Sequence, residues 1–143
     1  MPLMAPDMGI DLGTEHIDVY VRGRGIVISE PSFVVLDREN RHTVQAVGDE
    51  ARFLYGRSPD QLIAASPIRN GQVADFDMAE MMFRYFIRKA VGVSYLGKPR
   101  IIVSIPCGMD DVNRKALIEA LRMAGAKRIF LIEKPFASAI GTG

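Results

Sequence analysis

The sequence has one cysteine, almost no net charge and no long apolar run, and each shortage excludes a class of protein. With Cys107 alone, the 143-residue chain can form no internal disulfide and has no cluster of thiol ligands, which fits a reducing cytosol. A formal net charge of +1, with both signs interleaved, gives no field that would attract nucleic acid. No apolar run approaches the ~20 residues that span a bilayer. The opening MPLMAP lacks the basic and hydrophobic parts of a secretory signal.

What is present is the composition of a globular domain. Hydrophobic residues make up 48% of the chain and charged residues 24%. Alternating apolar residues indicate strands in the first third, and helical spacing of apolar residues follows at 77–92 and 109–124. The apolar runs 100–106 and 128–133 are typical of strands buried on both faces.

This order of elements predicts an α/β fold. Strand–helix–strand–helix with short links indicates parallel strands joined by right-handed crossovers, and the strands before them add an antiparallel flank. We therefore expect a mixed sheet of about five strands with helices on its faces. Residues 32–74 are expected to form a small inserted β-rich lobe.

The stretch GIDLGTEH, residues 9–16, carries the first candidate site. Alternation on both sides of a short polar turn predicts a β-hairpin. A tight turn of small residues leaves backbone N–H groups free to bind an anion; Gly13 permits close approach and Thr14 adds a hydroxyl. Asp11, at the base of the turn, could hold a hydrated Mg²⁺ through water. From this stretch alone, a hairpin whose Asp11 and Thr14 merely satisfy the turn is an equal alternative.

A second motif, LIEKPFASAIGTG at 131–143, ends a strand in an acidic residue and begins a helix of small residues. Together with GIDLGTE it resembles the actin-like ATPase superfamily, and within it the MreB/Mbl family of bacterial rod-shape proteins. The likeness continues through VYVRGRGIVISEPSFVVLD, AVGDEA, GRSP, GQVADFDMAEMMFRYFI, KPRIIVSIPCGMDDVNRKAL and AGAKRIF. The resemblance implies an actin-like (ribonuclease H-like) fold with ATP and Mg²⁺ as cofactors.

The resemblance also implies roles for particular residues. Asp11 would lie near the metal. Gly13, Thr14, Glu15 and His16 would surround the β- and γ-phosphates as the first phosphate loop. The segment 131–143 would pass behind the nucleotide and join the two halves of the fold.

Three departures from the family pattern affect the expected activity. The turn has His16 where asparagine is usual, and imidazole is bulkier and titrates near neutral pH. Lys134 stands where a catalytic acidic residue is usual, and Glu133, one place earlier, faces the other side of its strand. Lys134 could pair with a phosphate, so that ATP is held but hydrolysed slowly.

The third departure is that the likeness covers only a first half. Residues 1–31 and 75–143 would form subdomain IA without its C-terminal return helix, and residues 32–74 subdomain IB. The second phosphate loop and the adenosine-binding segment would lie in the missing half. We therefore expect weak or absent ATP binding and no ATPase activity in this chain alone; whether it is a shortened form or a natural truncation stays open.

The loop at 91–99 resembles one that dips into the inner leaflet of the cytoplasmic membrane, through Val93, Tyr95 and Leu96. The alternative is that Tyr95 and Leu96 fold under and cap the core. The resemblance implies an ATP-dependent, self-associating filament under the membrane, working with the cell-wall elongation machinery. A sugar or acid kinase of the same superfamily, or an inactive relic, are the alternatives.

Overall fold

The computed structural model describes residues 3–93 and 95–143. Its strands are β1 (Leu3–Met4), β2 (Met8–Leu12), β3 (His16–Val21), β4 (Gly25–Pro31), β5 (Val34–Asp37), β6 (Val44–Val47), β7 (Leu62–Ala65), β8 (Ile68–Arg69), β9 (Gln72–Val73), β10 (Tyr95–Leu96), β11 (Arg100–Ile105) and β12 (Arg128–Glu133). Its helices are α1 (Asp49–Arg57), α2 (Phe76–Val91), α3 (Asp111–Met123) and α4 (Lys134–Gly141).

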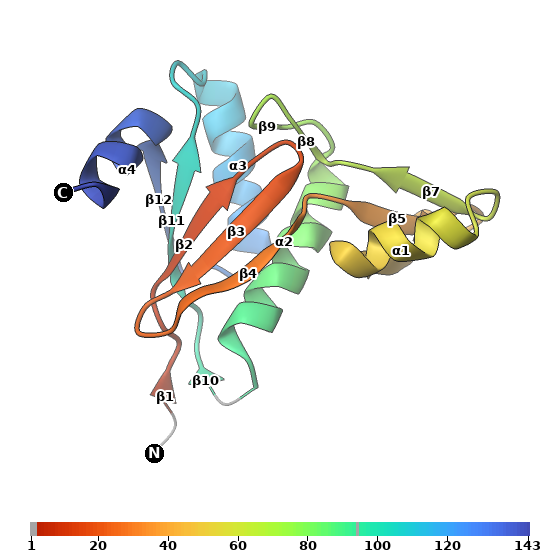
Figure 1. Cartoon of the computed structure of the whole chain (residues 1–143), viewed down its shortest axis with the longest axis horizontal. Helices are drawn as coiled ribbons and strands as arrows, with labels where there is room; N and C mark the ends of the chain where they lie inside the picture. Colours follow the sequence, from red (N-terminus) through yellow and green to blue (C-terminus); the bar gives the residue numbers. More distant parts are fainter. Residues whose placement is uncertain (1–2, 94) are drawn as a thin grey trace.

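The central sheet has five strands in the order β12-β11-β2-β3-β4, which confirms the predicted mixed sheet. β12, β11 and β2 are parallel, whereas β2, β3 and β4 form an antiparallel meander. The first meander turn and the carboxyl ends of β11 and β12 lie at the same end of the sheet (Figure 1). Residues about 90 and 120 positions after the turn therefore come next to it.

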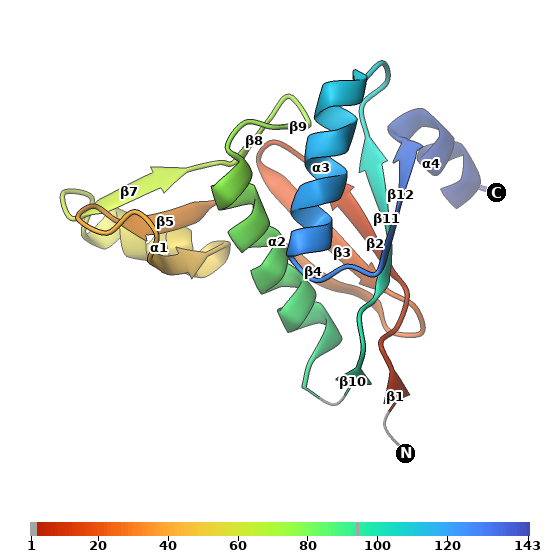
Figure 2. The ribbon, with the colours of Figure 1, turned by 180° about the vertical axis from the view of Figure 1, so that it is seen from behind.

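Both long helices, α2 and α3, pack against each other on one face of the sheet (Figure 2). The core lies between them and this face, where Val19, Ile101 and Val103 of the sheet and Phe83 and Phe86 of α2 are fully buried. Alternate residues on these strands point to the opposite face, which α2 and α3 leave open.

The open face carries a row of apolar side chains across the sheet. The row follows the strand register: Phe130 lies opposite Ile102, Ile102 opposite Gly9, Gly9 opposite Tyr20, and Tyr20 opposite Ile26. Its four apolar side chains are 44–69% exposed. The expectation that 100–106 and 128–133 are buried on both faces is therefore wrong. An apolar run cannot reveal that both helices lie on one face, or that β12 is an edge strand.

Residues between β4 and α2 form a smaller lobe beside the sheet (Figure 1). Its sheet has the order β6-β5-β7, and α1 packs on it around a small core of Val35, Ala46, Ala51 and Leu62. The hairpin β8–β9 returns the chain to α2. The predicted boundaries of this lobe, residues 32–74, stay a prediction.

At the other end of the sheet, β1 pairs in parallel with β10. Leu3 lies opposite Tyr95 and Met4 opposite Leu96. In the described part of the chain, no helix is long and apolar enough to cross a membrane.

Candidate functional site

The turn between β2 and β3 is closed by a backbone hydrogen bond in which Gly13 N–H donates to His16 O over 2.9 Å. A Cβ atom at position 13 would lie 2.5 Å from that same carbonyl oxygen, closer than side-chain carbons approach in proteins. Ser32 Oγ donates to Gly13 O over 2.9 Å from the start of the smaller lobe. The turn therefore needs glycine at position 13, because the carbonyl oxygen of His16 leaves no room for a Cβ atom there.

Thr14, at the tip of the turn, is held from the smaller lobe. Ser66 Oγ donates to Thr14 O over 2.7 Å, and Gly71 N–H donates to Thr14 Oγ1 over 3.3 Å. The hydroxyl hydrogen of Thr14 is left to donate elsewhere. Among the described residues, the backbone N–H groups of Thr14 and Glu15 have no acceptor within the protein. Two successive free amides and a hydroxyl form an arrangement that binds anions.

A hollow of about 460 Å³ lies beside this turn. It is lined by Thr14, Glu15, Ser32, Phe33, Arg52, Ser66, Ile68 and Arg69. The two arginines come from α1 and from the β8–β9 hairpin, and they bring positive charge to the site. Sequence reasoning missed them, because no local pattern indicates that the smaller lobe folds over the turn.

Asp11, on the open face at the end of β2, accepts hydrogen bonds from two side chains. Lys134 Nζ donates to Asp11 Oδ1 over 2.8 Å, and Ser104 Oγ donates to the same oxygen. Partial burial acts to raise the pKa of Asp11, but the hydrogen bonds from Lys134 and Ser104 outweigh it and lower that pKa below its usual range. Asp11 is thus an ionised carboxylate paired with an ammonium group.

This pairing does not suit the predicted magnesium site. A lysine ammonium already neutralises Asp11 and would repel a divalent cation held nearby through water. In the part of the chain that the structure describes, no group of three or more histidine, cysteine, aspartate or glutamate side chains could hold a metal ion. The residues present therefore fit an anion at the turn and do not fit Mg²⁺ at Asp11.

Glu133 and Lys134 take different partners. The Glu133 carboxylate lies 3.5 Å from Nη2 of Arg114 on α3, whereas Lys134 reaches Asp11 on β2. Hydrogen bonding to Glu133 also raises the pKa of the Cys107 thiol, which disfavours the reactive thiolate. The structure thus brings Lys134, but not Glu133, beside Asp11; the catalytic role expected for this pair of positions stays a prediction.

His16 lies at the start of β3, next to the turn. Its Nε2 is 2.8 Å from Ser29 Oγ on β4 and 3.8 Å from a carboxylate oxygen of Asp18. The imidazole is therefore bonded to β4, and its expected contact with a phosphate at the turn stays a prediction.

The residues expected to touch the membrane divide between surface and core. Val93 and Leu96 are exposed, the first completely and the second by 63%, and Met4 beside Leu96 is 80% exposed. Tyr95 is half-buried and packs against the main core. Tyr95 therefore caps the core, whereas Leu96 lies on the surface.

Comparison with curated proteins identifies relatives along the whole chain. It is 44% identical over 141 residues to the cell shape-determining protein Mbl of Bacillus cereus, covering 99% of this chain and 42% of the relative. It is 39% identical over 145 residues to the cell shape-determining protein MreB of Escherichia coli, with the same two coverages. The chain thus spans less than half the length of the curated relatives it matches.

Solved structures with the same fold are actin-like. MreB5 of Spiroplasma citri bound to ADP superposes with a TM-score of 0.82 at 25% identity, over 96% of this chain and 41% of that one. The MamK double helical filament superposes with a TM-score of 0.75 at 18% identity, over 94% and 42%, and shows the fold alone. The family model described as MreB/Mbl protein matches residues 5–143. The chain therefore belongs to the MreB/Mbl family and has an actin-like fold, as its sequence motifs predicted.

Proposed function

We propose that this chain is the first half of an ATP-dependent, actin-like filament subunit that contributes to cell shape. Family membership and the names of the curated relatives support a role in cell shape. The solved structures of MreB5 with ADP and with AMPPNP support nucleotide binding, and the MamK filament supports self-association. Family membership also favours this function over a sugar or acid kinase.

The observation that carries the proposal is the turn at Gly13–Glu15. Its two free N–H groups and the Thr14 hydroxyl would donate to the terminal phosphates of ATP, with positive charge from Arg52 and Arg69 nearby. Lys134 would keep Asp11 neutralised, which lowers its repulsion of the phosphates.

The wider setting is part of the same proposal. The filament would lie in the cytoplasm at the inner face of the membrane, touch it through the edge that carries Val93 and Leu96, and act with the cell-wall elongation machinery. With Lys134 at the position where the family usually has an acidic residue, the whole subunit would hydrolyse ATP slowly. Lost general-base assistance costs about 10²–10⁴-fold in rate.

Amide NMR spectra of this chain, titrated with ATP and separately with adenosine, test the proposal. The second half of the nucleotide site is expected to lie outside this chain, so the affinity should be millimolar at best. We expect ATP to shift the Thr14 and Glu15 amide signals and adenosine to leave them in place. Equal shifts with adenosine, or ATP-dependent shifts of other amides that leave these two in place, would refute the phosphate-binding role of the turn and favour an inactive relic.

A further inference from the structure

A second hollow, of about 490 Å³, lies at the end of the sheet opposite the turn. It is lined by Met4, Ala5, Pro6, Asp7, Arg22, Lys98, Arg100 and Lys127. These residues come from the segment before β2, from the β3–β4 turn and from the starts of β11 and β12. Backbone hydrogen bonds hold the walls together: Arg22 N–H donates to Asp7 O over 2.9 Å, and Lys127 N–H donates to Pro99 O over 2.8 Å. The hollow is therefore a structured part of the fold.

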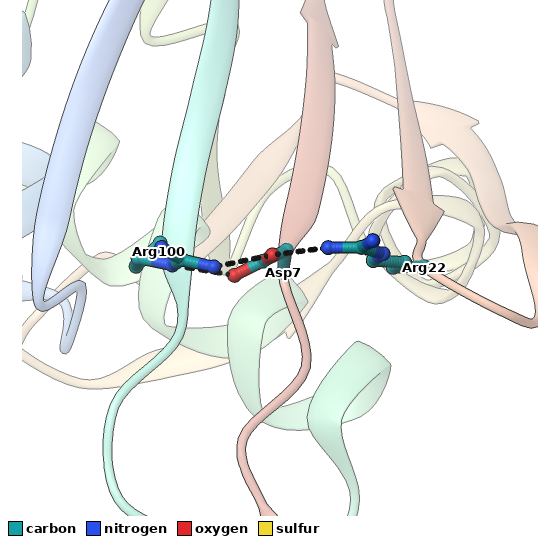
Figure 3. A network of polar contacts seen from close by, with 3 residues as sticks. All are labelled: Asp7, Arg22 and Arg100. Carbon is teal, nitrogen blue, oxygen red and sulfur yellow. Dashed lines mark hydrogen bonds and ion pairs between the residues drawn. The ribbon is translucent and has the colours of Figure 1, made fainter.

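Asp7 is the only carboxylate among the lining residues, and two arginines donate hydrogen bonds to it (Figure 3). Arg100 donates to both of its oxygens over 2.7 Å, and Arg22 donates from the other side over 3.2 Å. The hydrogen bonds from Arg100 and Arg22 lower the pKa of Asp7, so the carboxylate stays charged and keeps both guanidinium groups in place. Each arginine has donors left over for another acceptor.

The two lysines of the hollow add charge that no carboxylate of the described residues balances. Within the described residues, neither Lys98 nor Lys127 forms an ion pair. Four cationic side chains thus face one carboxylate, an excess of three positive charges in a protein whose net charge is only +1. A concave surface with this excess attracts an anion.

The hollow adjoins the edge of the molecule that carries the exposed apolar side chains of Met4, Val93 and Leu96. Met4 belongs to both, and Ala5 N–H donates to Leu96 O over 3.0 Å. β1 and β10, which carry Met4 and Leu96, lie beyond the ends of β2 and β11 in both views (Figures 1 and 2). Cations directly behind exposed apolar side chains match the order of layers in a membrane, where acyl chains are followed by phosphates.

We propose that this hollow binds the phosphate of an anionic phospholipid headgroup through Lys98, Lys127 and the free donors of Arg22 and Arg100. The inference rests on the proposed function only in taking the edge with Val93 and Leu96 as the one that touches the membrane. It adds the class of lipid recognised and the residues that recognise it. The volume of the hollow is within the range of small-ligand pockets, so a headgroup has room in it.

Flotation of the 143-residue chain with lipid vesicles tests the proposal. The vesicles are phosphatidylcholine alone, or phosphatidylcholine with one quarter phosphatidylglycerol. The chain should bind the anionic vesicles more tightly, and Lys98→Gln with Lys127→Gln should remove most of this preference, a loss of roughly tenfold or more. The matched control, Arg41→Gln with Lys115→Gln, removes the same charge from exposed positions elsewhere. It should keep the preference.

The outcomes separate this proposal from the membrane role itself. Val93→Ser with Leu96→Ser should weaken binding to both kinds of vesicle. If these changes have no effect, insertion of the apolar edge is wrong. The headgroup site is then judged by the lysine variant alone. Equal loss in the lysine variant and its control would show that only overall charge matters and would overturn the headgroup site. Binding of free glycerol phosphate by a chain that does not bind the anionic vesicles would show a site for soluble phosphate and overturn the lipid assignment.

Discussion

Replacing Gly13 with alanine is the sharpest test of the turn. The added Cβ would lie 2.5 Å from His16 O, the acceptor of the hydrogen bond that closes the turn. The clash is with backbone, so the turn has to shift, and with it the bonds from Ser32 and Ser66. Overpacking of this kind costs about 1–3 kcal/mol. We expect a loss of about 2 kcal/mol in the free energy of unfolding, or roughly 5–10 °C in Tm.

Gly9→Ala is the matched control, because it changes the same residue type within β2, four positions before the turn. There the nearest atoms to an added Cβ are 3.8 Å away, an ordinary van der Waals distance. Its stability should stay within about 0.5 kcal/mol of the parent. Thermal unfolding followed by circular dichroism gives the stability of all three proteins. Amide NMR with ATP shows whether the Thr14 and Glu15 signals still respond, as they should only in the parent and Gly9→Ala. If Gly13→Ala were as stable and as responsive as Gly9→Ala, the close approach would not shape the site.

Three further predictions concern charge and exposed surface. Lys134→Met should raise the pKa of Asp11, because an ammonium donor is lost while Ser104 remains; carboxyl NMR titration measures it, and an unchanged pKa would contradict the pairing. The hydrogen bond to Glu30 raises the pKa of Lys89, so this pair should stabilise the fold below pH 10.5 and lose that effect as pH rises through the raised value. Lys89→Met should therefore lower Tm near neutral pH and flatten its alkaline decline. Phe136 and Ile140 on α4 are 66% and 73% exposed, so the chain should dimerise through them at high concentration; light scattering from Phe136→Ser with Ile140→Ser should show the monomer.

Local patterns predicted the parts of the fold that depend on neighbours in sequence. The alternation around Gly13 fixes the β2–β3 hairpin, and the helical spacing of apolar residues marks α2 and α3. β7 carries no such signal, because its four residues, LIAA, form too short a pattern to identify a strand at the edge of a small sheet.

The rest of the candidate site depends on strand order and on lobe placement, which no local pattern contains. Ser104 meets Asp11 because β11 pairs with β2 in that register. Lys134 meets the same carboxylate because β12 follows β11 in the sheet. Once that strand order is known, the sequence shows that Asp11, Ser104 and Lys134 all lie at or just after the carboxyl ends of neighbouring parallel strands, and their proximity follows. Arg52 and Arg69 could not be found in this way, because they come from the smaller lobe.

The serines at the turn also tie the smaller lobe to the sheet. The chain passes from the sheet to the smaller lobe after β4 and returns after β7; Ser32 lies in the first passage and Ser66 in the second. Each donates its hydroxyl to a carbonyl of the turn, Ser32 to Gly13 and Ser66 to Thr14. The two segments that connect the sheet to the smaller lobe are thus both hydrogen-bonded to one loop. A rotation of the smaller lobe about these segments would break at least one of the two bonds, at about 1 kcal/mol each, so the loop would oppose that rotation.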